Sequence, residues 1–115
     1  NFKHKISNFQ ISDRTIKEDC QISKWVIYSS STAIFEAIYQ GCIPIRLSLD
    51  LVSKLSDPLW QIKTDYIFKI NTEQELSKII KKTNNLKYQI NSSKCLSFLI
   101  SKLCSKLKID ALESF

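Results

Sequence analysis

The sequence contains no methionine, one glycine, two prolines and one histidine among its 115 residues. So little glycine and proline argues against a long linker or a loop-rich secreted scaffold. The single histidine, His4, has no partner at the spacing of a metal site, and no Cys-x-x-Cys pair occurs. No apolar run reaches the ~18 residues that a membrane-spanning helix needs. Because a natural chain starts with methionine, we expect this one to be a processed product or, as we favour, a fragment of a longer protein.

Hydrophobic residues make up 43% of the chain and aromatic residues 10%, which is enough to bury the core of one domain. The four cysteines are widely and irregularly spaced, and they are Cys20, Cys42, Cys95 and Cys104. This spacing favours reduced, mostly buried thiols and therefore a cytoplasmic protein.

The net charge of +6 comes from 15 lysines and two arginines against 11 acidic residues. Nucleic-acid-binding surfaces usually interleave arginine with aromatic residues, whereas the lysines here are expected to be scattered over polar faces. We therefore expect no nucleic-acid partner. The charge suits an anionic ligand or an anionic membrane surface equally well. The basic last helix leaves peripheral membrane contact open, although its apolar stripe favours packing against protein.

Short apolar runs alternate with amphipathic segments along the chain. Four runs have the length and composition of strands, at residues 7–11, 24–28, 43–47 and 66–70. Four segments have helical periodicity or capping signals, at residues 15–21, 33–40, 72–82 and 92–108. A short helical turn is expected around Asp57–Trp60. The alternation predicts an α/β, Rossmann-like, three-layer domain with a parallel sheet, formed by residues 1–115 as one unit.

The predicted strand that ends at Tyr28 is followed by four hydroxyl residues, 29–32, and then by a helix. Ligands of parallel sheets bind beyond the carboxyl ends of the strands. A helix start placed there offers free N–H groups and a partial positive charge, and small hydroxyl side chains let a phosphate approach. The turn is thus a candidate phosphate site. The alternative is that Ser30 or Ser31 only caps the helix.

Glu36 lies about one helical turn beyond Thr32 and on the same side of the predicted helix. A carboxylate at that place can accept two hydrogen bonds from vicinal hydroxyls such as those of a ribose. The alternative is a solvated surface glutamate. Gly41 suits the left-handed position that ends such a helix.

Residues 29–45 read SSSTAIFEAIYQGCIPI. This stretch resembles the donor-site signature of GT-B type glycosyltransferases, in which a small-residue turn, a helix with a glutamate, a glycine and a proline-containing strand follow one another. It is similar to bacterial lipid-linked N-acetylglucosaminyltransferases and to enzymes that build capsular and surface polysaccharides. The resemblance implies the C-terminal, nucleotide-sugar-binding half of such an enzyme, inactive without its N-terminal acceptor domain.

The resemblance implies that Ser30, Ser31 and Thr32 hold the donor phosphates and that Glu36 holds the ribose. Arg46, at the end of the next strand, is a further candidate for an anion, or else a partner in an ion pair at the rim. No Asp-x-Asp motif occurs, so we expect neither a metal nor a cofactor. Two alternatives stay open, namely a nucleotide-sugar 2-epimerase of the same fold and a non-catalytic Rossmann-like interaction domain. The catalytic residues are not identified.

Trp60 is a further candidate, as one wall of the nucleotide pocket. The alternative is that it anchors the long connection at residues 48–64, between the strands predicted at 43–47 and 66–70.

Overall fold

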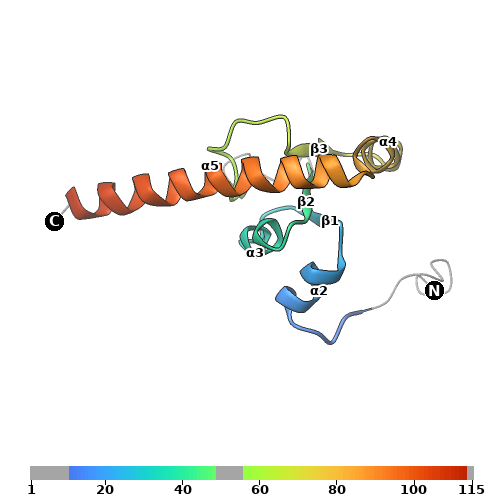
Figure 1. Ribbon diagram of the computed structural model, residues 1–115, viewed down its shortest axis with the longest axis horizontal. Coiled ribbons are helices and arrows are strands. Elements are labelled where there is room, and N and C mark those ends of the chain that lie inside the picture. The colour runs from blue at the N-terminus through green and yellow to red at the C-terminus, as the bar shows by residue number, and fades with distance from the viewer. Residues whose placement is uncertain (1–10, 49–55, 114–115) are drawn as a thin grey trace.

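The computed structural model describes residues 11–48 and 56–113, and the surroundings of side chains as far as Lys106. Its centre is a parallel sheet of three strands in the order β1-β2-β3 (Figure 1). The strands are β1 (Trp25–Tyr28), β2 (Ile43–Leu47) and β3 (Phe68–Ile70). The predicted α/β fold with a parallel sheet is therefore confirmed, and its strands come from the runs predicted at 24–28, 43–47 and 66–70. The strand predicted at 7–11 lies outside the described residues, apart from Ile11, and so does His4.

Pro44 sits in the central strand, where a missing N–H would normally break the sheet. In β2, Ile43 N–H bonds back to the β1 side at Lys24 O (2.7 Å), whereas Ser48 N–H bonds to Ile70 O on the β3 side (2.7 Å). Backbone groups alternate sides along a strand, so the nitrogen of Pro44 faces β3. The missing donor thus affects only the pairing with β3.

The strand predicted at 66–70 is two residues too long at its start, because β3 begins at Phe68. Pairing between β2 and β3 begins at Ile45 opposite Phe68, one residue after Pro44. Tyr66 and Ile67 form a turn instead. The physical reason is that Pro44 has no N–H to offer a strand at that level, so the ladder starts only beyond it.

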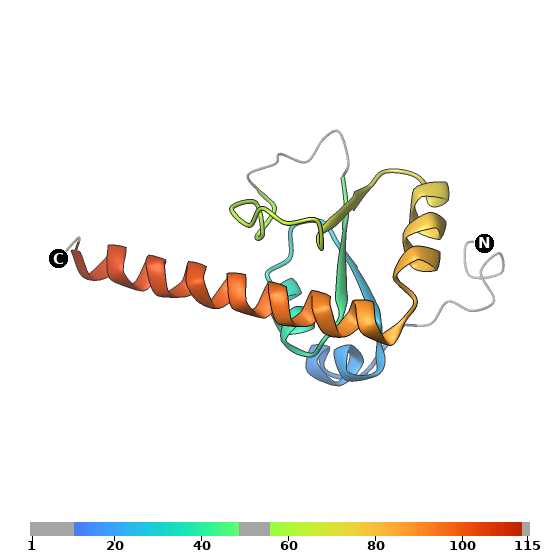
Figure 2. The same cartoon turned by 45° about the horizontal axis from the view of Figure 1, so that its top comes forward.

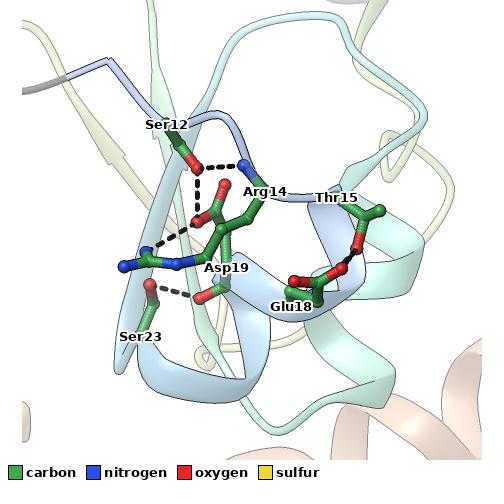
Figure 3. A network of polar contacts seen from close by, with 6 residues as sticks. All are labelled: Ser12, Arg14, Thr15, Glu18, Asp19 and Ser23. Atoms are coloured by element: carbon green, nitrogen blue, oxygen red, sulfur yellow. Dashed lines mark hydrogen bonds and ion pairs between the residues drawn. The ribbon is translucent and has the colours of Figure 1, made fainter.

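Helix α2 (Ile16–Ile22) begins at the predicted capping residue. Thr15 Oγ1 accepts a hydrogen bond from Glu18 N–H at 3.2 Å and donates one to the Glu18 carboxylate at 3.0 Å. Figure 3 shows how Asp19 ties the preceding turn to this helix, because it accepts hydrogen bonds from the Ser12 hydroxyl (2.8 Å) and the Arg14 guanidinium (3.4 Å). All these contacts are near the surface, so they define the helix start more than they stabilise the fold.

Helix α3 (Ile34–Tyr39) ends as its glycine predicts. Gly41 has φ +93°, Gly41 N–H bonds to Ile38 O, and Cys42 N–H bonds to Ala37 O, both at 3.0 Å. This pair of bonds is the Schellman motif, which satisfies the last helical carbonyls and turns the chain into β2. A Cβ on Gly41 would meet open space, so the requirement for glycine comes from φ alone.

Helix α4 (Glu73–Thr83) starts where the sequence predicts, with Thr72 Oγ1 accepting from Glu75 N–H at 3.2 Å. The last helix, α5 (Leu86–Glu113), starts six residues before the predicted Ser92. Asn85 Oδ1 accepts a hydrogen bond from Tyr88 N–H at 2.7 Å and caps this earlier start. With 28 residues the helix is about 42 Å long, and its C-terminal part projects beyond the rest of the molecule (Figure 2).

Side chains alternate between the faces of β1, so Val26 and Tyr28 share one face while Trp25 and Ile27 share the other. The larger cluster of buried hydrophobic residues lies on the first face, where Tyr28 packs with Ile34, Ala37 and Ile38 of α3, Leu96 and Ile100 of α5, and Leu59. On the second face, Trp25 Nε1 donates a hydrogen bond to Thr83 Oγ1 of α4 at 2.8 Å. Helices therefore contact both faces of the sheet.

Candidate functional site

The hydroxyl turn follows β1 directly and lies at the carboxyl edge of the sheet, where Tyr28 pairs with Arg46 of β2. Ser30, Ser31 and Thr32 are exposed, while Ser29 is half-buried. The turn borders a cavity of about 390 Å³ between α2, β1 and α3, whose lining includes Ser29, Ser30, Ser31, Ile16, Cys20 and Ile27. Hydroxyl groups and an apolar hollow thus lie side by side at the place where parallel sheets bind ligands.

The N–H groups at the start of α3 are mostly occupied. Ser31 Oγ accepts a hydrogen bond from Ala33 N–H (3.2 Å), and Ser31 O accepts one from Ile34 N–H (3.4 Å). Phe35 N–H bonds to Thr32 O at 3.1 Å. The expectation that these first N–H groups are free for a phosphate is therefore wrong for Ala33, Ile34 and Phe35. The reason is that the chain enters this six-residue helix through tight turns that bond internally.

Glu36 is half-buried in the first turn of α3. One of its carboxylate oxygens accepts a hydrogen bond from the Gln40 amide at 3.4 Å, one turn further along the helix. The Glu36 charge also helps to raise the pKa of Cys20, after the larger effect of burial. Glu36 is not among the residues that line the cavity beside the serine turn, although Ala33, Ile34 and Ala37 of the same segment are.

Arg46 is buried, with 3% of its surface exposed, and lies in a polar cluster with Asp57 and Tyr28. Its Nε donates to Ser29 O at 3.1 Å and lies 3.6 Å from the Asp57 carboxylate. Asp57 also accepts hydrogen bonds from Tyr28 Oη (3.1 Å) and Leu59 N–H (2.9 Å). The cluster ties together the ends of β1 and β2, the serine turn and the 57–59 turn. Arg46 therefore holds the backbone of the candidate site in place through its hydrogen bond to the Ser29 carbonyl.

The buried cluster controls the charge state of Tyr28. Burial, followed by the Asp57 charge and the hydrogen bond to it, raises the pKa of Tyr28 well above its ordinary range. The phenol thus stays protonated and donates to Asp57. This matters because a buried carboxylate that loses its donors destabilises the fold strongly.

Sequence reasoning missed Asp57 as a partner of Arg46, although one signal was present. Asp57 precedes Pro58, and its side chain accepts the N–H two residues on, which is the Asx turn that such a pair favours. The predicted turn at Asp57–Trp60 is confirmed by the bond from Trp60 N–H to Asp57 O at 3.1 Å. Trp60 lines separate hollows near Lys63, away from the residues that line the cavity at the serine turn.

The cysteines of the described residues are all free thiols, two of them buried. Cys42 Sγ donates to the carbonyl oxygens of Cys20 (3.2 Å) and Ser23 (3.3 Å), so it fastens the end of α2 to the start of β2. Burial, and then the neighbouring Cys20, raises the pKa of Cys42 to about 12. In the part of the chain that the structure describes, no group of three or more His, Cys, Asp or Glu side chains is placed to hold a metal ion.

Comparison with protein families, with curated proteins and with solved structures finds no match to this chain. Among the helices of the described residues, none is both long enough and apolar enough to cross a membrane. The fold thus defines a small α/β protein with a three-stranded parallel sheet and a hydroxyl-rich turn at its carboxyl edge.

Proposed function

We propose that this chain binds a nucleotide-activated sugar and forms the donor-binding, C-terminal half of a GT-B type glycosyltransferase with a Rossmann-like, three-layer fold. The observation that carries the proposal is the exposed run Ser30–Thr32 at the carboxyl end of parallel strand β1, beside a cavity of about 390 Å³. The order of strand, hydroxyl turn, glutamate-bearing helix, glycine and proline-containing strand supports it.

In this proposal the hydroxyls of Ser30, Ser31 and Thr32 donate to the phosphate oxygens of the donor, and Glu36 accepts from the ribose hydroxyls. The apolar wall of the cavity, with Ile16 and Val26, suits the flat face of a base or sugar ring. Arg46 acts on the same turn through Ser29 O rather than by direct contact with the ligand. No metal ion is assigned a role.

The base that activates the acceptor belongs, in this proposal, to a second domain that faces the carboxyl edge of the sheet. The chain alone should therefore bind a donor without transferring its sugar to a glycan, lipid or protein acceptor. Four free thiols suit a reducing compartment, so the proposal places the protein in the cytoplasm.

The test is calorimetric titration with uridine, guanosine and cytidine diphosphates, on the wild type and on Glu36→Gln. The substitution keeps the side-chain shape but removes a charged acceptor worth roughly 1.5–3 kcal/mol, so affinity should fall about 10- to 100-fold. Glu73→Gln is the matched control, because Glu73 also lies in the first turn of a helix but on exposed α4. Equal affinity of Glu36→Gln and the wild type would refute the ribose role.

A second candidate, a non-catalytic interaction domain, has its own supporting observation. Ser31 Oγ already accepts a backbone N–H, Glu36 already accepts from Gln40, and Arg46 is buried against Asp57. If these contacts are only structural, Ser31→Ala should lower the free energy of unfolding by about 1 kcal/mol, and no nucleotide should bind even to the wild type. A nucleotide-sugar 2-epimerase of the same fold would bind the same nucleotides. It would be distinguished from a glycosyltransferase by its product, an epimerised sugar instead of a transferred one.

A further inference from the structure

The excess of positive over negative charge in this chain lies in one segment. Residues 76–109 contain eight lysines and no acidic residue, a formal charge of +8. The rest of the chain has nine basic and eleven acidic residues, a formal charge of −2. The segment that carries the net positive charge comprises most of α4 and α5.

Part of this charge surrounds a groove between α5 and the turn after Asp57. The groove has a volume of about 610 Å³. Its lining consists of Trp60, Gln61, Ile62, Lys63, Leu99, Lys102, Leu103 and Lys106. The four α5 residues among them follow the spacing of a single helix face. We call these eight residues the basic groove.

The basic groove combines an apolar floor with a cationic rim. Leu99, Leu103 and Ile62 are half-buried, and Trp60 keeps 39% of its surface exposed. Lys63, Lys102 and Lys106 are exposed, and no Asp or Glu lines the groove. The ion pairs found in the described part of the chain involve arginines, Arg14 and Arg46, so they do not neutralise this rim.

A second aromatic side chain lies beside the rim. Phe98 is 61% exposed, and Lys102 Nζ lies 5.3 Å from the centre of its ring. Exposed tryptophan and phenylalanine flanked by lysines, on a helix that projects past the molecule (Figure 2), form the pattern of a surface that rests in a lipid headgroup layer. The excess positive charge of this surface complements the negative surface of anionic bilayers.

We propose that the basic groove docks the protein on the surface of an anionic phospholipid bilayer. Lys63, Lys102 and Lys106 contact the lipid phosphates, while Trp60 and Phe98 enter the boundary between headgroups and acyl chains. The attachment is peripheral and reversible. It does not depend on a nucleotide site at the serine turn, because no residue of the basic groove lines the cavity beside that turn.

The test is co-sedimentation of the whole chain with phosphatidylcholine vesicles that contain or lack phosphatidylglycerol. The groove variant replaces Lys63, Lys102 and Lys106 with glutamine. The control variant replaces Lys78, Lys81 and Lys87, which are exposed and lie in the same basic segment outside the groove, so both variants lose the same charge. Thermal melts check that both remain folded.

We expect binding only to the anionic vesicles, weakening as salt is raised. Each lysine near such a surface contributes about fivefold in affinity, so the groove variant should bind about a hundredfold more weakly, and the control variant much less so. A blue shift of tryptophan emission on binding should disappear in Trp60→Phe. Equal loss in the two variants would show general charge attraction and overturn the proposal. If the chain binds dispersed decyl phosphate but no vesicles, the groove takes a free ligand and the proposal is overturned. If the chain binds neither decyl phosphate nor vesicles, the proposal is also overturned.

Discussion

At the scale of single residues, Arg46 shows how burial decides what a charged side chain does. The sequence places it at the end of a strand, where it could meet a ligand or an acidic partner. In the structure it is 3% exposed, hydrogen-bonded to Ser29 O and paired with Asp57. A buried guanidinium needs such partners, and removing one of them leaves an uncompensated buried charge that costs about 3–5 kcal/mol. Its partner lies eleven residues further on, and sequence spacing does not reveal it.

Cys42 gives a prediction at the same scale. Burial raises the pKa of its thiol from 9.0 to about 12, so the unfolded chain releases this proton at lower pH than the folded one. The stabilising contribution of the neutral thiol is complete below pH 9 and is lost as pH rises from 9 towards 12, by up to about 1.4 kcal/mol per pH unit. Urea unfolding of the wild type and Cys42→Ala across this range, under reducing conditions, measures the difference.

The free energy of unfolding of the wild type, relative to Cys42→Ala, should therefore fall as pH rises above 9. Cys104→Ala serves as the control, because Cys104 is exposed. The same pH dependence in Cys42→Ala as in the wild type would show that the buried thiol is not responsible.

At the scale of elements, the sequence predicted best where a local signal decides the structure. Two predicted caps, Thr15 and Thr72, accept hydrogen bonds at the starts of α2 and α4. The glycine predicted to end α3, Gly41, has the positive φ that this position requires. Two predicted element boundaries were wrong, one because of an effect across the sheet and one because of a local capping residue. Pro44 shortens β3 through its missing N–H, and Asn85 starts α5 before its apolar stripe begins. In the candidate site, the turn and the position of Glu36 were predictable, but the internal bonds of the turn were not.

Asn85 also supplies a prediction for the start of α5. Its Oδ1 accepts the Tyr88 N–H at 2.7 Å, so Asn85→Ala should lower the free energy of unfolding by about 1 kcal/mol, as expected for the loss of a cap. The neighbouring Asn84→Ala is the matched control. Asn84 Oδ1 accepts a solvent-exposed hydrogen bond from Lys24 Nζ at 3.1 Å. Asn84→Ala should therefore lower the free energy of unfolding by less than about 0.5 kcal/mol. Chemical denaturation measures both. If Asn84→Ala proves the more costly, the Asn85 side chain does not cap the start of α5.

At the scale of the whole molecule, two surfaces of different chemistry lie on one small α/β body. The serine turn is at the carboxyl edge of the sheet, beside an apolar cavity. The basic groove lies between α5 and the Trp60 turn and holds three lysines. The Arg46–Asp57 cluster lies between these two regions, because Asp57 and Leu59 belong to the turn that leads to Trp60 while Arg46 bonds to Ser29. A ligand at the serine turn therefore meets a turn whose backbone is already held in place.

The central claim is that a nucleotide binds at the turn after β1, and its location is the most direct test. Backbone amide chemical shifts of the isotope-labelled chain should be followed by NMR during titration with uridine, guanosine and cytidine diphosphates. The account predicts that at least one of them shifts the amides of Ser30–Ala33 and Glu36, and that Glu36→Gln shifts the same amides only at higher concentration. Absence of any shift at millimolar nucleotide, or shifts that gather around Trp60 and α5 instead, would contradict a donor site at this turn.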